Sequence, residues 1–135
     1  MSDVLTEDRF ALKDDQSIMV ALAMLRRRLV ELNIPELLIS KLMTVSSELS
    51  VNVIKYATRG TLFLKQLKTD RKRGLEISVV DEGPGIADVE LALEDHFSSS
   101  GTLGLGLPGV KRMVNDFRVE SEVGKGTRVY ATVWL

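Results

Sequence analysis

The sequence predicts a two-layer α/β sandwich, in which helices cover one face of a mixed, mostly antiparallel sheet. Three observations support this fold class. Two helical stripes of apolar residues follow an opening strand, charged or glycine-rich turns separate strand-like segments, and a glycine-rich loop precedes a further helix. The chain has 135 residues, of which 44% are hydrophobic and 27% are charged. This length and composition predict a single domain that spans residues 1–135.

The first two elements are a strand and an amphipathic helix. Residues 4–12 alternate loosely between apolar and polar side chains, which favours a strand. From residue 16 onward, apolar side chains recur at steps of three and four and define one face of a helix: Ile18, Leu22, Leu25, Leu29 and Leu32. The three arginines at 26–28 fall off this face, so we expect them to be solvated rather than to bind a partner.

A second helix and a pair of strands follow. Pro35 can begin a helix, and the helical pattern continues to about residue 57. Its expected inward-facing residues are Leu38, Leu42, Val45, Leu49 and Tyr56. Residues 61–67 and 75–81 then read as strands joined by the charged hairpin 68–74, and the second strand is apolar enough to be central.

The rest of the chain predicts a turn, a loop, a helix and a hairpin. Residues 82–86 (EGPGI) form a turn and residues 88–95 a short helix or single turn, whereas glycines and serines at 97–106 indicate a loop. The next helix is expected over 107–117, with Pro108 in its first turn and an apolar stripe of Leu107, Val110, Val114 and Phe117. Strands at 118–123 and 127–135 close the chain as a hairpin.

Composition excludes several classes of protein. The net charge is −1, from 18 basic and 19 acidic residues, which argues against binding nucleic acid through a basic face. No apolar run approaches the roughly 20 residues of a membrane span, and the first ten residues do not resemble a signal peptide. Without cysteine there is neither a disulfide nor a thiolate metal site. We therefore expect a cytoplasmic protein.

The glycine-rich segment contains the spacing G-x-G-x-x-G at Gly104, Gly106 and Gly109. A dinucleotide-binding fold requires a buried strand directly before the first glycine, and the residues FSSSGTL do not suit one. GKGT (124–127) likewise lacks the context of a P-loop and reads as a hairpin turn. A glycine loop that enters a helix nevertheless leaves backbone N–H groups free to bind an anion. Gly104, Gly106 and the N–H groups near Leu107 are thus candidates to hold a polyphosphate.

Two further groups of residues suggest a nucleotide site. Glu48 and Asn52, four apart on one helix, present a carboxylate and an amide in one direction. The amide oxygen suits Mg²⁺ beside phosphate oxygens, and the carboxylate suits a base for an attacking hydroxyl. Asp81 ends a buried strand before a tight glycine turn, where it can accept a hydrogen bond from the exocyclic amine of adenine. Thr127 can add a hydroxyl near the base. Each residue alone also has an ordinary structural explanation.

The order of these segments strengthens the interpretation. ELSVNVIKYA (48–57), DEGPGI (81–86), SGTLGLGLPGVKR (100–112) and GKGT (124–127) together resemble the N, G1, G2 and closing boxes of the GHKL ATPase/kinase superfamily. That group includes gyrase, Hsp90-type, MutL and histidine-kinase ATP domains. More narrowly, essentially the whole chain is similar to the RsbT-type switch serine/threonine kinases of bacterial stressosomes, with GLPGVKR as the most specific feature.

The resemblance implies a Bergerat fold that binds ATP and Mg²⁺. Glu48 would be the catalytic base, Asn52 the Mg²⁺ ligand, Lys55 the matching lysine of the N box, and Asp81 the acceptor for the adenine amine. Further nucleotide-binding residues are implied in the pocket, in the lid and in the closing box: Gly83, Gly85, Ile86, Gly101, Gly104, Leu105, Gly106, Leu107 and Thr127.

The resemblance also implies partners. The substrates would be STAS-domain scaffold and antagonist proteins, phosphorylated on serine or threonine. The freed kinase would then activate a downstream output protein, a phosphatase or a cyclase-type protein. Neither nucleic acid nor a membrane is implied. The alternative is an anti-sigma factor of the same fold that sequesters a sigma factor. The short lid and the GLPGVKR segment favour the switch kinase, and capture of a sigma factor would reverse this choice.

Overall fold

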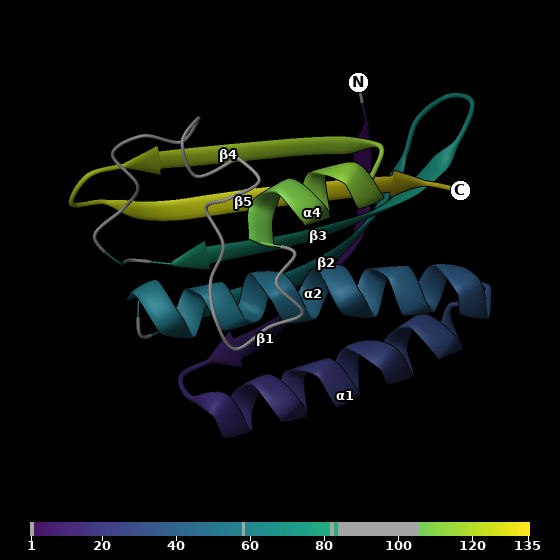
Figure 1. The fold of residues 1–135 in the computed structure, drawn as a ribbon. Coiled ribbons are helices and arrows are strands. Elements are labelled where there is room, and N and C mark those ends of the chain that lie inside the picture. The colour runs from purple at the N-terminus through teal and green to yellow at the C-terminus, as the bar shows by residue number, and fades with distance from the viewer. Residues whose placement is uncertain (1, 58, 82, 84–105) are drawn as a thin grey trace.

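The computed structural model describes residues 2–57, 59–81, 83 and 106–135. Within this part of the chain, strands form one sheet and helices pack against it (Figure 1). The elements, in chain order, are β1 (Asp3–Leu12), α1 (Asp15–Glu31), α2 (Glu36–Ala57), β2 (Gly60–Lys68), β3 (Arg73–Asp81), α4 (Gly106–Met113), β4 (Asp116–Glu122) and β5 (Gly126–Trp134). The predicted α/β sandwich is thereby confirmed.

The strands follow the order β1-β2-β3-β5-β4 in the sheet. Every pair between these described strands is antiparallel, so the expectation of a mostly antiparallel sheet is confirmed and none of these pairs is parallel. The antiparallel hairpin after α4 also excludes a dinucleotide-binding crossover at the G-x-G-x-x-G segment, because that fold continues into a parallel strand. Leu12 pairs with Gly60, and Gly60 pairs with Asp81, which brings three strand termini to one end of the sheet.

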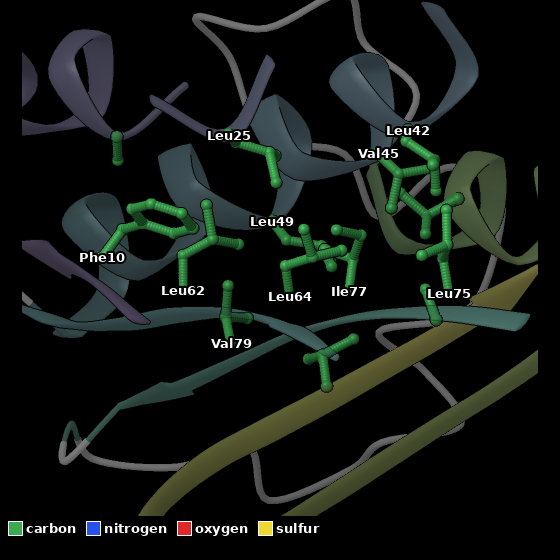
Figure 2. Packing of buried hydrophobic residues seen from close by; sticks show 14 of the residues in the cluster. Phe10, Leu25, Leu42, Val45, Leu49, Leu62, Leu64, Leu75, Ile77 and Val79 are labelled. Carbon is green, nitrogen blue, oxygen red and sulfur yellow. The ribbon is translucent and has the colours of Figure 1, made fainter. Parts of the chain in front are cut away.

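The helices cover one face of the sheet and share a core with it. Figure 2 shows Leu62, Leu64 and Ile77 of the central strands beside Leu49 of α2 and Leu25 of α1. All five of these side chains are fully buried. Leu107 and Val110 of α4 belong to the same hydrophobic cluster. Burial of such side chains is the main favourable contribution to folding, and it fixes α2 between the other two helices and the sheet.

Local interactions define where α1 begins and where its arginines point. The Asp14 side chain accepts from the Ser17 backbone N–H at 2.7 Å, while the Ser17 hydroxyl accepts from the Asp14 N–H, which forms a capping box. Arg26 then contacts Glu36 of α2 at 2.6 Å, and Arg28 contacts Asp8 of β1 at 3.2 Å. The arginine run therefore joins α1 to its neighbours within the chain.

α2 is long and apolar enough to meet the length and composition of a membrane span. Its apolar side instead packs against the sheet, as expected for the core helix of a domain. The prediction that Tyr56 faces inward is wrong, because this residue of the last turn is 52% exposed. The other residues predicted to face inward on this helix are buried or half-buried: Leu38, Leu42, Val45 and Leu49.

The helix predicted over 107–117 is shorter than expected. α4 ends at Met113, and Phe117 lies in β4 rather than on a helical stripe. The cause is competition from the C-terminal hairpin. The Asn115 backbone N–H donates to the Thr132 carbonyl, and the Asn115 side-chain oxygen accepts from the Trp134 N–H at 2.8 Å. These bonds to β5 replace the ones that a longer helix would make.

The face of the sheet opposite the helices carries paired charges. Lys65 lies between Glu7, at 3.7 Å, and Glu76, at 4.0 Å. Burial raises the pKa of the Glu76 carboxyl, and this effect exceeds the opposing influence of Lys65 and Arg118. Because side chains alternate along β3, Glu76 points away from the face that Ile77 shares with the helices.

Candidate functional site

Asp81 lies at the end of β3, on the face of the sheet that the helices cover. Side chains alternate along a strand, so Asp81 points to the same side as the buried Ile77 and Val79. Its Oδ1 atom accepts hydrogen bonds from the backbone N–H of Gly83, at 2.9 Å, and of Thr127, at 3.2 Å. Both bonds between described residues end on Oδ1. Oδ2 is therefore positioned to accept a donor from a ligand.

Because Gly83 has no side chain, the turn that follows Asp81 can lie close to the last turn of α2. A Cβ atom at position 83 would overlap the Cβ of Ala57 and lie 2.8 Å from its Cα. Gly60 makes a similar approach, since a Cβ there would lie 2.8 Å from Val53 and 3.2 Å from the Asp81 Cβ. The end of β3 and the C-terminal part of α2 therefore meet at one end of the molecule (Figure 1).

Thr127 joins Asp81 from the neighbouring strand. Its alternation with the buried Val129 places it on the helix-covered face of β5, and its side chain is largely buried. The hydroxyl groups of Thr127 and Ser121 are hydrogen-bonded at 2.9 Å, and the Ser121 hydroxyl also donates to the Gly126 carbonyl at 3.1 Å. Ser121 was not predicted as a site residue, because its position opposite Thr127 follows from the observed register of β4 and β5.

The second part of the site lies on α2. At 100° per residue, Glu48, Asn52 and Lys55 fall within a sector of about 60° on the helix. Their exposure increases along the helix: Glu48 is 2% exposed, Asn52 is half-buried and Lys55 is exposed. The Lys55 ammonium lies 5.5 Å from the centre of the Tyr56 ring. From its buried to its exposed end, this side of α2 therefore carries the Glu48 carboxylate, the Asn52 amide and the Lys55 ammonium group.

The third part is the start of α4. Gly106 begins this helix in the left-handed region, with a φ of 56°, which favours glycine. The first five residues of α4 are buried, and the helix packs against α2 (Figure 1). Backbone N–H groups in the first turn of a helix have no partner within the helix and favour anions. This part of the expected phosphate site therefore lies beside the helix that carries Glu48 and Asn52.

The structure brings three of the predicted site residues into contact and places three others on one side of α2. Asp81, Gly83 and Thr127 are in contact, and Glu48, Asn52 and Lys55 share one side of the helix that Gly83 approaches. Gly106 and Leu107 begin the helix beside it. The remaining predicted residues lie outside the described part of the chain: Gly85, Ile86, Gly101, Gly104 and Leu105. The predicted turn at 82–86, apart from Gly83, and the elements at 88–95 and 97–105 also lie outside it.

The donor set suits a cation that is shared with a ligand. Over the residues with described positions, no group of three histidine, cysteine, aspartate or glutamate side chains forms a metal site. A lone amide such as that of Asn52 fits a Mg²⁺ ion that takes most of its ligands from phosphate oxygens and water. The buried Glu48 beside it fits a role in accepting a proton.

The chain is similar to a family of known proteins and to individual relatives. The model for "Histidine kinase-, DNA gyrase B-, and HSP90-like ATPase" matches residues 38–135. The chain is 44% identical over 96 residues to serine/threonine-protein kinase RsbT of Bacillus subtilis (strain 168), covering 71% of this chain and 72% of the relative. It is also 32% identical over 103 residues to an anti-sigma F factor of Caldanaerobacter subterraneus subsp. tengcongensis, covering 72% and 71%.

A solved structure supports the fold. A chain in the crystal structure of the SiaB-SiaC complex from Pseudomonas aeruginosa matches with a TM-score of 0.60. The match covers 98% of this chain and 91% of that chain, at 12% sequence identity. At this identity the likeness concerns the fold alone.

Proposed function

Because the chain belongs to the family of histidine kinase-, DNA gyrase B-, and HSP90-like ATPases, we propose that it phosphorylates STAS-domain proteins in a partner-switching module. The chain is an ATP-binding protein serine/threonine kinase. In the proposed module it uses Mg-ATP to modify STAS-domain scaffold and antagonist proteins of a bacterial stress response. It then binds and activates a downstream output protein, either a phosphatase or a cyclase-type protein. We place this activity in the cytoplasm.

In this proposal, ATP binds between the end of β3 and α2, with its phosphates toward the start of α4. Oδ2 of Asp81 accepts a hydrogen bond from the adenine amine, while Oδ1 stays fixed by Gly83 and Thr127. Glycine at 83 keeps the turn close to α2. The N–H groups of Gly106 and Leu107 favour the phosphates. The proposed site also includes Gly85, Ile86, Gly101, Gly104 and Leu105.

The proposed chemistry needs few side chains, because phosphoryl transfer depends mainly on positioning and on neutralisation of charge. Mg²⁺, when bound, neutralises phosphate charge. Asn52 would hold it through its amide oxygen, and Lys55 would contribute positive charge near the solvent. Glu48 would accept the proton of the serine or threonine hydroxyl. Its burial favours this role, because it excludes water and orients the carboxylate.

One observation carries the proposal. The bifurcated acceptor Asp81 lies where β3, β5 and the end of α2 meet, and that same helix carries Glu48 and Asn52 on one side. The residues proposed as adenine acceptor, base and metal ligand therefore lie on adjoining elements, which supports the proposal.

The turn at Gly83 leads to a prediction about stability and binding. We expect Gly83→Ala to lower the free energy of unfolding by about 1–3 kcal/mol, because its Cβ must displace the backbone of Ala57. The displaced turn also moves Asp81, so the ATP affinity should fall by roughly tenfold. Urea unfolding and calorimetry measure the two effects.

Gly124→Ala is the matched control for Gly83→Ala. Gly124 has a φ of +83° and open space around it, so alanine there should cost about 1 kcal/mol from backbone strain alone. Its ATP affinity should be that of the parent. Equal ATP affinities for the two alanine variants would show that Gly83 does not position the adenine site.

The second candidate function is that of an anti-sigma factor. It rests on the similarity to an anti-sigma F factor at 32% identity, a protein of the same family. In that case the main activity would be sequestration of a sigma factor, with phosphorylation of an antagonist as an accompanying reaction. ATP turnover alone does not separate the two functions.

Incubation of the purified chain with Mg-ATP and candidate STAS-domain proteins, followed by phosphosite mass spectrometry, tests the proposal. We expect phosphoserine or phosphothreonine on the STAS domain, at a rate that falls by at least about 100-fold when Glu48→Gln replaces the parent. A parallel pull-down with candidate sigma factors tests the second function. Stable capture of a sigma factor, without phosphorylation of any scaffold, would favour the anti-sigma factor.

A further inference from the structure

Ser121 links residues of the proposed adenine site to one another. It lies in β4 directly opposite Thr127, on the helix-covered face of the sheet that Val119 also shares. Its hydroxyl contacts the Thr127 hydroxyl at 2.9 Å and donates to the Gly126 carbonyl at 3.1 Å. The end of β3, the start of β5 and the end of β4 lie together at one end of the sheet (Figure 1). Ser121 therefore reaches the site from the strand beyond Thr127.

The Ser121 hydroxyl has a single proton, and this sets the direction of both contacts. A carbonyl oxygen accepts hydrogen bonds and cannot donate them, so the contact with Gly126 uses the Ser121 proton. The contact between the two hydroxyls is then made with the proton of Thr127. In this arrangement the Thr127 oxygen keeps lone pairs but has no proton to offer a ligand. Thr127 can therefore meet a ligand only as an acceptor.

The peptide group between Gly126 and Thr127 connects Ser121 to Asp81. Its carbonyl accepts from the Ser121 hydroxyl, and its N–H donates to Oδ1 of Asp81 at 3.2 Å. Hydrogen bonds that share a peptide group polarise it in the same sense and strengthen one another. Ser121 therefore helps to hold the carboxylate that is proposed to accept the adenine amine.

We propose that Ser121 is a positioning residue for nucleobase selection, which keeps Thr127 and Asp81 as acceptors toward the ligand. This inference rests on the proposed ATP site and adds to it the residue that sets its hydrogen-bonding pattern. An edge that carries acceptors alone suits a nucleobase that presents an amine, as adenine does. It disfavours a base that presents a carbonyl at the same position, because acceptors then face each other without a donor.

The Kd values of ATP and inosine triphosphate (ITP) in Mg²⁺, measured by calorimetry, test the role of Ser121. The base of ITP carries a carbonyl where adenine carries the amine, and it lacks the further amine of guanine. The parent should bind ATP at least about tenfold more tightly than ITP. Ser121→Ala releases the Thr127 proton, which can then donate to the ITP carbonyl. We expect the preference for ATP to fall by roughly fivefold. Ser121→Thr keeps a hydroxyl and should retain the preference of the parent within about twofold.

Thr127→Val separates this role from a merely structural one. Valine has the shape of threonine without the hydroxyl, so Ser121→Ala has no proton to release in this background. Adding Ser121→Ala to Thr127→Val should therefore leave the ratio of the two Kd values unchanged. Loss of the bond to Gly126 should lower the affinity for both nucleotides alike, because it loosens the peptide group that holds Asp81. The double-mutant cycle thus measures the coupling between the two hydroxyls.

Thr69→Ala is the matched control for Ser121→Ala. It removes a hydroxyl that donates to the Lys72 carbonyl, in the hairpin at the other end of β2 and β3. The variant should bind ATP and ITP as the parent does, and circular dichroism verifies that every variant is folded.

Two outcomes would overturn the role of Ser121 while leaving the ATP site intact. One is a ratio of Kd values in Ser121→Ala that equals that of the parent. The other is an equal fall in this ratio when Ser121→Ala is added to Thr127→Val. A parent chain that binds neither nucleotide would instead overturn the proposed function, and this inference with it.

Discussion

Glu48→Gln is expected to lower the rate of phosphoryl transfer by orders of magnitude while ATP still binds. Glutamine keeps the size of the side chain and its hydrogen-bonding oxygen at a position that is only 2% exposed, but it cannot take up a proton at neutral pH. Loss of a general base typically lowers the rate by about 10²–10⁴-fold. We therefore expect the rate of phosphorylation of a STAS-domain substrate to fall by that factor, with the Kd of ATP changed by no more than about threefold.

Glu36→Gln provides the matched control for this experiment. It makes the same chemical change on the same helix, at an exposed residue of the first turn that pairs with Arg26. Its rate and its ATP affinity should both remain at the level of the parent. If Glu48→Gln phosphorylates its substrate as fast as Glu36→Gln does, Glu48 is not the base.

Asn52→Ala is expected to remove the dependence of ATP binding on Mg²⁺. The amide oxygen is the proposed protein ligand of the ion, and loss of a hydrogen-bonding or ligand group to a charged partner costs about 1.5–3 kcal/mol. We expect the Kd of ATP in Mg²⁺ to rise by roughly 10–100-fold. In EDTA, where this interaction is absent from both proteins, the parent and Asn52→Ala should bind ATP equally.

Asn115→Ala is the matched control for Asn52→Ala, because it removes the side chain of an asparagine outside the proposed site. The Asn115 side chain accepts from the Trp134 N–H at the far end of the sheet, so its removal should affect stability and not nucleotide binding. Unchanged affinity of Asn52→Ala for Mg-ATP in calorimetry would contradict the role proposed for Asn52.

Much of the fold was predictable because its helices and strands carry strong local patterns. Leu25 and Leu29 recur on one side of α1, and Leu42, Val45 and Leu49 on one side of α2, and all are fully buried. Such stripes reflect burial against a sheet and can be recognised without knowing where the sheet lies. The candidate site on α2 was predictable for the same reason, because the spacing of Glu48 and Asn52 is local.

The contacts that complete the site could not be predicted from local patterns. Asp81 meets Thr127 because β5 lies beside β3, although 46 positions separate them in the chain. The approach of Gly83 to Ala57 likewise depends on how α2 crosses the end of the sheet. Resemblance to a family suggested these residues, whereas the hydrogen bond from the Thr127 N–H to Oδ1 of Asp81 follows only from the order of the strands.

The two errors arise from tertiary context. The apolar spacing that placed Phe117 on a helix was overridden by the hydrogen bonds of β4 to β5. Tyr56 follows the same spacing as Leu49 but belongs to the last turn of α2, and it is 52% exposed. Periodicity defines the side of a helix and does not report where the underlying sheet ends.

Titration of the parent chain with ATP and with GTP, in Mg²⁺, tests the central claim most directly. The claim is that Asp81 recognises adenine in the same site in which Asn52 and Glu48 act on the phosphates. Guanine carries a carbonyl where adenine carries an amine. With GTP, two hydrogen-bond acceptors, the guanine oxygen and Oδ2 of Asp81, would therefore face each other without a donor. We predict that ATP binds at least about tenfold more tightly than GTP, and that Asp81→Asn loses this preference. Equal affinity of the parent chain for both nucleotides would contradict the claim.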